Sequence, residues 1–201
     1  KDYFLNYEGL NNDFTITHGA AKKIEFHNAN TEEGWKITFV ETGAAAMTGA
    51  RVLRALPYIR SDHFGLTYGD GVANIDLTAE LAFHRAHGCQ STVAAVRAPS
   101  RFGEMVIDEL EHVSDFREKP DAAPGRINGG FFILKRKGLE QYLQPAGENL
   151  VWERQPLECL ARNHQLKAFD HGGFWQPMDT YREFELLNEL WRSDRAPWKV
   201  W

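Results

Sequence analysis

A short apolar run, residues 91–96 (S-T-V-A-A-V), lies between polar residues in the middle of the chain. Runs of this kind and length are typical of a strand that is buried on both faces of a parallel sheet. A helical apolar pattern precedes it, with Asp76 placed to cap the helix and Gly88 placed to end it. A strand buried in this way requires helices on both faces of its sheet, so the run predicts an α/β layered fold.

The rest of the chain continues this alternation of strands and helices. Strands are predicted near residues 14–17, 23–26, 37–40, 64–68, 104–107, 112–116, 130–134 and 167–169, and helices over 47–59, 152–161 and 180–192. No repeat or linker divides the 201 residues, which predicts one domain over 1–201. The chain begins at Lys1 on what reads as the end of a helix, so we expect that domain to be incomplete at its N-terminus.

Composition excludes several classes of protein. The net charge of −5 and the pI of about 5.9 argue against a protein that coats nucleic-acid phosphates, which would be basic. No stretch approaches the roughly 18 apolar residues of a membrane span. Cys89 and Cys159 are far apart and match no metal-binding spacing, which favours reduced thiols in a cytoplasmic protein.

Two aspartates are the first candidate site residues. Asp70 follows a predicted strand in Tyr68-Gly69-Asp70-Gly71, and Asp179 follows another short extended segment. Open α/β sheets bind ligands at such strand ends, and two carboxylates can hold one Mg²⁺ against a triphosphate. The pair indicates nucleotidyl transfer. Each aspartate also has a structural alternative, because Asp-Gly is a common turn and Asp179 could cap the next helix.

Further polar motifs lie between the two aspartates. Lys119, after Glu118, could neutralise a ligand phosphate, although Glu-Lys-Pro alone is more typical of a surface turn. Asn128 and the glycines after it could bind sugar hydroxyls or simply form a turn. Glu153 offers a carboxylate acceptor beside Trp152, or begins a helix.

A small-residue loop from 43 to 51 leads into a predicted helix. Its backbone N–H groups and Arg51 could bind phosphate, but the spacing matches neither the Walker pattern nor G-x-G-x-x-G. His84-x-x-His87 is a weak metal candidate, since residues three apart on a helix usually face solvent. No nucleophile-plus-base motif for Ser, Cys or His is evident.

Taken in order, these motifs resemble the glucose-1-phosphate cytidylyltransferase family over essentially the whole chain. The matching segments are V-E-T-G (40–43), M-T-G-A-R (47–51), Y-G-D-G (68–71), R-F-G (101–103), E-K-P (118–120), I-N-G-G-F-F (127–132), W-E-R-Q-P-L (152–157) and G-F-W-Q-P-M-D-T (173–180). Related thymidylyl and uridylyl enzymes carry a Q-P-x-G type segment in place of residues 40–49, and this difference favours CTP.

The resemblance implies a three-layer αβα sandwich around a mixed, mostly parallel sheet. It implies that CTP and α-D-glucose 1-phosphate give CDP-glucose and pyrophosphate, in the cytoplasm, for surface-polysaccharide (O-antigen) synthesis, with Mg²⁺ as cofactor and a homo-oligomeric assembly. The implied catalytic residues are Asp70, Lys119 and Arg51, with Mg²⁺ on Asp70 and Asp179. The implied substrate-binding residues are Thr48, Gly69, Gly103, Glu118, Asn128, Gly129 and Glu153.

One departure from the family is large. The family begins with a glycine-rich G-G-x-G-T-R loop and a P-K-P segment, and neither is present in this sequence. Without the strands of that portion, the sheet would expose unpaired edges. Two alternatives therefore stay open: a nucleotidyltransferase of the same fold with another base or sugar, and a non-catalytic module for sugar-nucleotide binding or oligomerisation.

Overall fold

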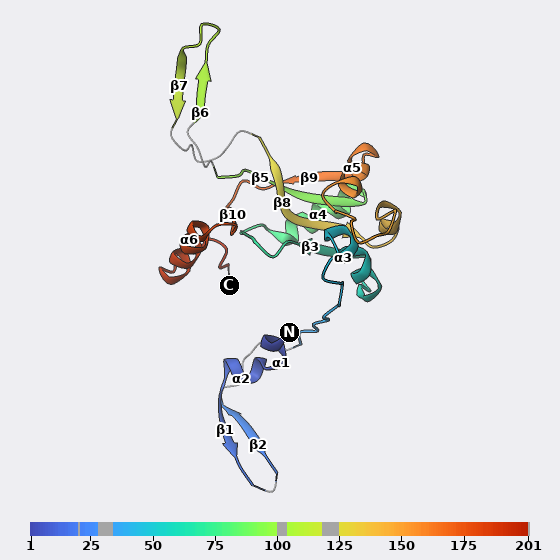
Figure 1. Cartoon of the computed structure of the whole chain (residues 1–201), viewed down its shortest axis with the longest axis vertical. Coiled ribbons are helices and arrows are strands. Elements are labelled where there is room, and N and C mark those ends of the chain that lie inside the picture. Colours follow the sequence, from blue (N-terminus) through green and yellow to red (C-terminus); the bar gives the residue numbers. More distant parts are fainter. Residues whose placement is uncertain (20, 28–33, 100–103, 118–124, 201) are drawn as a thin grey trace. The chain divides into compact units, whose positions relative to one another are not determined.

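The computed structural model of the chain describes residues 1–19, 21–27, 34–99, 104–117 and 125–200 (Figure 1). Two compact units can be distinguished, Lys1–Glu41 and Thr42–Trp201. In the described residues no helix is both long enough and apolar enough to cross a membrane.

The first unit consists of two short helices and a hairpin. Helices α1 (Asp2–Leu5) and α2 (Tyr7–Asn11) precede strand β1 (Asp13–Thr17), which pairs antiparallel with β2 (Lys23–His27). Both strands confirm sequence predictions. The strand predicted over 37–40 is wrong, because that segment has no regular structure and no partner strand among the described residues. None of the described residues of this unit is buried.

The second unit is built on a four-stranded sheet. Its order is β3 (His63–Thr67), β8 (Ile127–Lys135), β5 (Ser91–Val96) and β9 (Leu166–Asp170). Strand β5 confirms the buried strand predicted from its apolar run. The sheet is mixed, as expected, but only the β5–β9 pairing is parallel, while β8 is antiparallel to both of its neighbours. Strand β3 is an edge strand of the described sheet.

Helices cover both faces of this sheet and give three layers. Helix α4 (Leu77–His87) lies on one face, where its Phe83 contacts Phe169 of β9 at 5.7 Å between ring centroids. Helices α3 (Thr48–Ala55) and α5 (Gln155–Arg162), with the short turns η1 (Leu56–Tyr58) and η2 (Leu139–Tyr142), lie on the other. The main core forms there around the fully buried Phe132 and Trp152, whose rings meet edge to face at 5.7 Å.

Helix α4 begins and ends where the sequence predicts. The carboxylate of Asp76 accepts a hydrogen bond from the Ala79 N–H at 2.9 Å, and Gly88 adopts the left-handed conformation after the last turn (φ 66°). The two histidines of this helix neither form a described metal cluster nor both face solvent. His84 is fully buried, and both rings bond to the hydroxyl of Thr92 at 2.8 Å.

Glu80, one turn before His84, is a buried carboxylate of this helix. Its side chain is 0% exposed, and neither oxygen has a hydrogen-bond partner among the described residues. Burial raises the pKa of Glu80 to about 7, and burial together with the nearby His87 and His63 lowers the pKa of His84 to about 4. Both groups are therefore pushed toward their neutral forms.

The remaining elements are short strands and a C-terminal helix. Strands β6 (Glu104–Ile107) and β7 (Val113–Arg117) form a hairpin, and β4 (Gly71–Ala73) pairs with β10 (Trp175–Pro177). Helix α5 begins at Gln155 rather than at the predicted 152, since Pro156 is best placed in a first turn. Helix α6 (Tyr181–Arg192) begins as predicted, with Thr180 and Glu183 forming a capping box.

Candidate active site

The short β4–β10 ladder brings the two predicted aspartates to the same end of the structure. Pro177 pairs with Gly71 in this antiparallel register, and the next residue, Met178, donates its N–H to the carbonyl of Asp70 at 2.8 Å. Asp70 is therefore the acceptor of a hydrogen bond whose donor directly precedes Asp179, although 109 positions separate the two aspartates in the sequence. Both residues are exposed.

This pair fits the donor set that Mg²⁺ takes in nucleotide sites. Mg²⁺ commonly binds one or two carboxylates and completes its octahedron with waters and substrate phosphates. No group of three or more metal-ligating side chains is found among the described residues, so a protein cage of the structural type is not formed by them. The Asp179 N–H is held by Glu183 Oε2 at 2.9 Å, which fixes its backbone at the start of α6.

A second group of predicted residues meets at the start of helix α3. The hydroxyl of Thr48 donates to Glu153 Oε2 at 2.7 Å and accepts from the Trp152 N–H at 2.9 Å. One hydroxyl therefore ties the loop that carries Glu153 to the first turn of α3. The Thr48–Glu153 pairing was not predicted, because 105 positions separate the two residues and no local pattern connects them.

Tyr68 lies next to the third predicted residue, Asn128. Its hydroxyl accepts a hydrogen bond from the Asn128 side-chain amide at 3.3 Å, and the Glu153 carboxylate lies close enough to act on it electrostatically. Burial, first, and the nearby Glu153 carboxylate, second, raise the pKa of Tyr68 far above its ordinary value of 10, so the hydroxyl keeps its proton. The structure thus brings Thr48, Asn128 and Glu153 together, with Asp70 close enough to act on Tyr68 electrostatically.

The glycines after Asn128 serve packing in this structure. A Cβ at Gly129 would lie 2.7 Å from a methyl of Val96, and at Gly130 (φ 76°) it would lie 2.7 Å from the Tyr68 ring. Strand β8 bulges here against β5, and the Asn128 side-chain oxygen accepts the Gly130 N–H at 2.8 Å. Asn128 therefore bonds through its oxygen to the bulge and through its amide N–H₂ to Tyr68.

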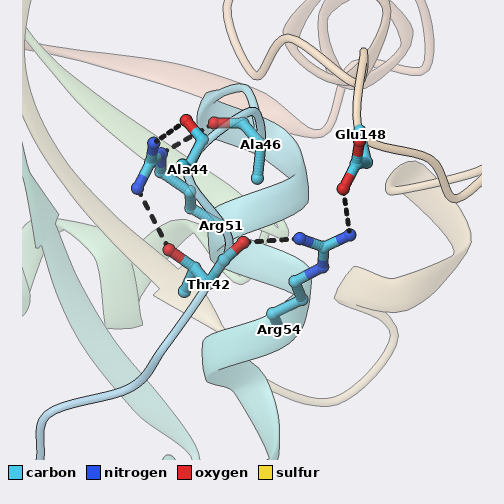
Figure 2. Close-up of polar contacts among 6 residues, drawn as sticks. All are labelled: Thr42, Ala44, Ala46, Arg51, Arg54 and Glu148. Carbon is cyan, nitrogen blue, oxygen red and sulfur yellow. Dashed lines mark hydrogen bonds and ion pairs between the residues drawn. The ribbon is translucent and has the colours of Figure 1, made fainter.

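Arg51 points back onto the loop that precedes its helix (Figure 2). Its guanidinium donates to the carbonyl of Ala46 at 2.8 Å, to the Thr42 hydroxyl at 3.1 Å and to the carbonyl of Ala44 at 3.5 Å. Arg54 adds a bond to the Thr42 carbonyl at 2.5 Å and an ion pair with Glu148 at 3.6 Å. Arg51 therefore shapes this loop, and a role toward phosphate stays a prediction.

The first turn of α3 is partly occupied by protein. Met47 N–H donates to the carbonyl of Glu148 at 2.8 Å, and Ala50 N–H donates to the carbonyl of Leu150 at 3.2 Å. A Cβ at Gly49 would meet Leu150 at 2.8 Å, so the 148–150 segment packs directly on this turn. The Met47 and Ala50 N–H groups are therefore already hydrogen-bonded within the protein.

Of the four remaining predicted site residues, the structure describes only Gly69. Gly69 has open space where a Cβ would be, which leaves its surroundings accessible. Gly103, Glu118 and Lys119 lie outside the described residues.

Sequence reasoning missed three residues that organise the site, namely Tyr68, Arg54 and Trp175. Tyr68 was noted only as part of its motif. Trp175 donates its indole N–H to the Gly129 carbonyl at 2.8 Å and so links β10 to the bulge of β8. The available signal was a tyrosine or tryptophan close in sequence to a candidate site residue. When such a side chain is buried, its O–H or N–H group usually forms a hydrogen bond.

Sequence comparison shows that the chain is related to known enzymes. Residues 50–180 match the family described as "Nucleotidyl transferase". The chain is 43% identical to glucose-1-phosphate cytidylyltransferases of Salmonella typhi and Salmonella typhimurium, over all of this chain and 76% of each relative. More distantly, it is 29% identical to a mannose-1-phosphate guanyltransferase of Schizosaccharomyces pombe, over 80% of this chain and 45% of that one.

The fold is likewise found in a solved structure. A Bacillus anthracis protein described as a candidate glucose-1-phosphate thymidylyltransferase, in complex with sucrose, aligns with a TM-score of 0.56 and 17% identity. The alignment covers 75% of this chain and 63% of that chain. At this identity the likeness concerns the fold alone, and it agrees with the three-layer α/β architecture.

Proposed function

Because the chain belongs to the nucleotidyl transferase family and, within it, to the glucose-1-phosphate cytidylyltransferases, we propose that it joins CTP and α-D-glucose 1-phosphate into CDP-glucose and pyrophosphate. The observation that carries this proposal is the 43% identity over the entire chain to enzymes of that name. The convergence of Thr48, Asn128 and Glu153 beside Asp70 supports it, since these side chains offer hydroxyl-binding and metal-binding oxygens in one place.

The chemistry requires alignment and charge neutralisation. A sugar phosphate is already a nucleophile at neutral pH, so no protein base is needed to activate it. The protein must hold the attacking oxygen in line with the α-phosphorus and offset the negative charge of both substrates. This requirement fits a site of carboxylates, amides and cations in which no nucleophile-plus-base motif is evident.

We assign the metal and phosphate roles as follows. Asp70 and Asp179 would hold Mg²⁺, which supplies positive charge against the triphosphate when bound. Lys119 would contact the sugar phosphate as a point charge. Arg51 and Thr48 would shape the loop against which the nucleotide lies, through the bonds to Thr42, Ala46 and Glu153.

We assign the sugar side to the residues around the β8 bulge. Glu153 and Asn128 would bind glucose hydroxyls, with Glu118, Gly103, Gly69 and Gly129 around them. Both Glu153 and Asn128 are held by other protein groups, which keeps their geometry constant before substrate arrives. Such preorganisation lowers the entropic cost of binding a flexible, highly hydrated sugar.

The test is pyrophosphate release from CTP and α-D-glucose 1-phosphate with Mg²⁺, with dTTP and UTP in parallel reactions. The proposal expects release with CTP and at least about tenfold less with the other two, because a base is discriminated by the hydrogen bonds it completes. Equal release with dTTP would identify a same-fold enzyme with another base. Binding of CDP-glucose without turnover would identify a non-catalytic sugar-nucleotide module instead.

We further propose a cytoplasmic homo-oligomer whose product feeds surface-polysaccharide synthesis. Many apolar side chains of the first unit and of the β6–β7 hairpin are exposed in the single chain, among them Phe4, Phe14, Trp35, Ile107 and Phe116. Exposed apolar surface on this scale is typical of a protein-protein interface. The measurement is the molar mass in solution by light scattering, and a monomer at all concentrations would contradict the assembly.

A further inference from the structure

The carboxylate of Glu183 holds the backbone on both sides of Asp179. Its Oε2 atom accepts the Asp179 N–H at 2.9 Å and the Thr180 N–H at 2.9 Å. A capping box needs only the second of these bonds, because the carboxylate at the third helical position reaches back to the N-cap N–H alone. The bond to Asp179 is therefore additional to the cap.

Two bonds to one oxygen fix the direction in which the Asp179 side chain leaves the backbone. The N–H groups of Asp179 and Thr180 lie in the two planar peptide units that flank the Asp179 Cα, and only two soft dihedrals join those planes. When both planes are directed at a single atom, both dihedrals of Asp179 are constrained. The Cα–Cβ bond of Asp179 then has one direction, whichever rotamer the side chain adopts.

We propose that Glu183 is a positioning residue that aims the Asp179 carboxylate toward the Mg²⁺ site it would share with Asp70. This inference rests on the proposed function, which assigns both aspartates to that metal. The residue before Asp179 is itself tied to Asp70, since the Met178 N–H donates to the Asp70 carbonyl at 2.8 Å. Glu183 extends this connection by one residue, to Asp179 itself.

Glu183 is in turn held by an anchored helix. It lies in the first turn of α6, and its N–H donates to the Thr180 hydroxyl at 3.3 Å. Leu187, one turn further along the same face, is buried at 5% exposed. The anchor matters because an acceptor can orient a neighbouring backbone only if its own position is constant.

Three substitutions separate positioning from charge and from helix stability. Glu183→Ala removes the acceptor of both N–H groups. Glu183→Gln removes the negative charge but keeps an oxygen that can accept them, since Gln also serves in capping boxes. Thr180→Ala is the matched control, because it breaks the other half of the capping box and leaves the two bonds to Glu183 in place.

The experiment uses the full chain and Mn²⁺, which prefers the same oxygen ligands as Mg²⁺, in a titration followed by electron paramagnetic resonance. We expect E183A to raise the dissociation constant of Mn²⁺ about tenfold, the lower end of the loss usually seen when a group that orients a metal ligand is removed. E183Q and T180A should stay within about twofold of the parent. In kinetic assays E183A should raise the half-maximal Mg²⁺ concentration similarly, while the KM for glucose 1-phosphate stays within about twofold.

Two metal-free measurements accompany the titration. The Asp179 amide should exchange its hydrogen about tenfold faster in E183A than in E183Q, because only E183A lacks an acceptor for it. E183A and T180A should lower the unfolding temperature by similar amounts, since each breaks the same cap. Unequal Mn²⁺ affinities at similar stability would then be due to the position of Asp179.

Three outcomes would overturn the inference. They are Mn²⁺ binding by E183A as tight as that of the parent, an equal loss in T180A and E183A, and an equal loss in E183Q and E183A, which would make the charge of Glu183 the cause.

Asp179→Asn distinguishes these failures from a failure of the proposed metal role. If the parent binds no Mn²⁺, or if D179N binds it equally well, Asp179 is not a metal ligand and both proposals fail. If D179N binds Mn²⁺ more weakly but the parent releases no pyrophosphate, only the enzyme activity fails, and the Mn²⁺ titrations still decide the role of Glu183.

Discussion

At the scale of single residues, Asp70 is exposed at the end of a ladder whose hydrogen bonds all use backbone atoms. The β4–β10 pairing and the Met178–Asp70 bond leave the Asp70 carboxylate out of the fold's own network of described bonds. Because the fold does not use this exposed carboxylate, replacing it should leave the stability of the protein unchanged. Any loss of activity would then be due to catalysis alone.

We expect Asp70→Asn to lower kcat for CDP-glucose formation by about 100-fold or more, because removing one electrostatic contact to a transition state commonly costs that much. The unfolding temperature should be unchanged. Asp76→Asn is the matched control, since it makes the same chemical change at the cap of α4, where Asn serves as well as Asp. Activity near the parent level in D70N would make Asp70 a turn residue.

Glu80 gives a pH dependence of stability that can be predicted with its sign. Its pKa is raised by burial to about 7 in the folded chain, so the unfolded chain loses this proton first as pH rises. Stability from this group is complete below its unfolded pKa and is lost as pH rises through the folded value.

The measurable consequence is a difference between the parent and Glu80→Gln. Between pH 5 and pH 8 the parent should lose about 2 kcal/mol of unfolding free energy relative to E80Q, given about 1.36 kcal/mol per pKa unit. Urea unfolding at both pH values measures it. Parallel pH profiles for the two proteins would mean that Glu80 has an ordinary pKa in the folded state.

At the scale of elements, the capping box at the start of helix α6 is a local sequence signal that stabilises a helix next to the site. The Thr180 hydroxyl accepts a hydrogen bond from the Glu183 N–H at 3.3 Å, and the Glu183 carboxylate accepts one from the Thr180 N–H at 2.9 Å. Thr180→Ala should cost about 1 kcal/mol of stability, the usual value of an N-cap. Thermal unfolding measures the loss, with Thr180→Ser as the variant that retains the cap. Identical stability of T180A and the parent would contradict the prediction.

The elements also separate what local sequence determines from what it does not. Asp76 and Thr180 define helix starts through side-chain bonds to backbone N–H groups three residues later, and Gly88 defines a helix end through its left-handed conformation, so the sequence predicts all three directly. The pairing of Thr48 with Glu153 depends on the packing of distant segments, and no periodicity reveals it. The predominance of antiparallel pairing in the described sheet was missed for the same reason, since an apolar run predicts burial but not the direction of its neighbours.

At the scale of the whole molecule, the two units differ in how much they bury. The second unit contains every buried residue of the described chain, with Phe132, Leu134 and Trp152 at its centre, whereas the first unit has none. Apolar burial is the main source of folding free energy. In the single chain we therefore expect the second unit to have a much higher free energy of unfolding than the first.

Hydrogen exchange followed by mass spectrometry tests this difference and the proposed assembly together. In dilute solution the amides of β1 and β2 should exchange about 100-fold faster than those of β5 and β8, because local opening costs less where little is buried. Raising the protein concentration should slow exchange in β1 and β2 if copies of the chain associate through their exposed apolar side chains, Phe14, Ile16 and Ile24. Concentration-independent, rapid exchange there would exclude these strands from the interface, and strong protection at every concentration would show that the first unit is stabilised within a single chain.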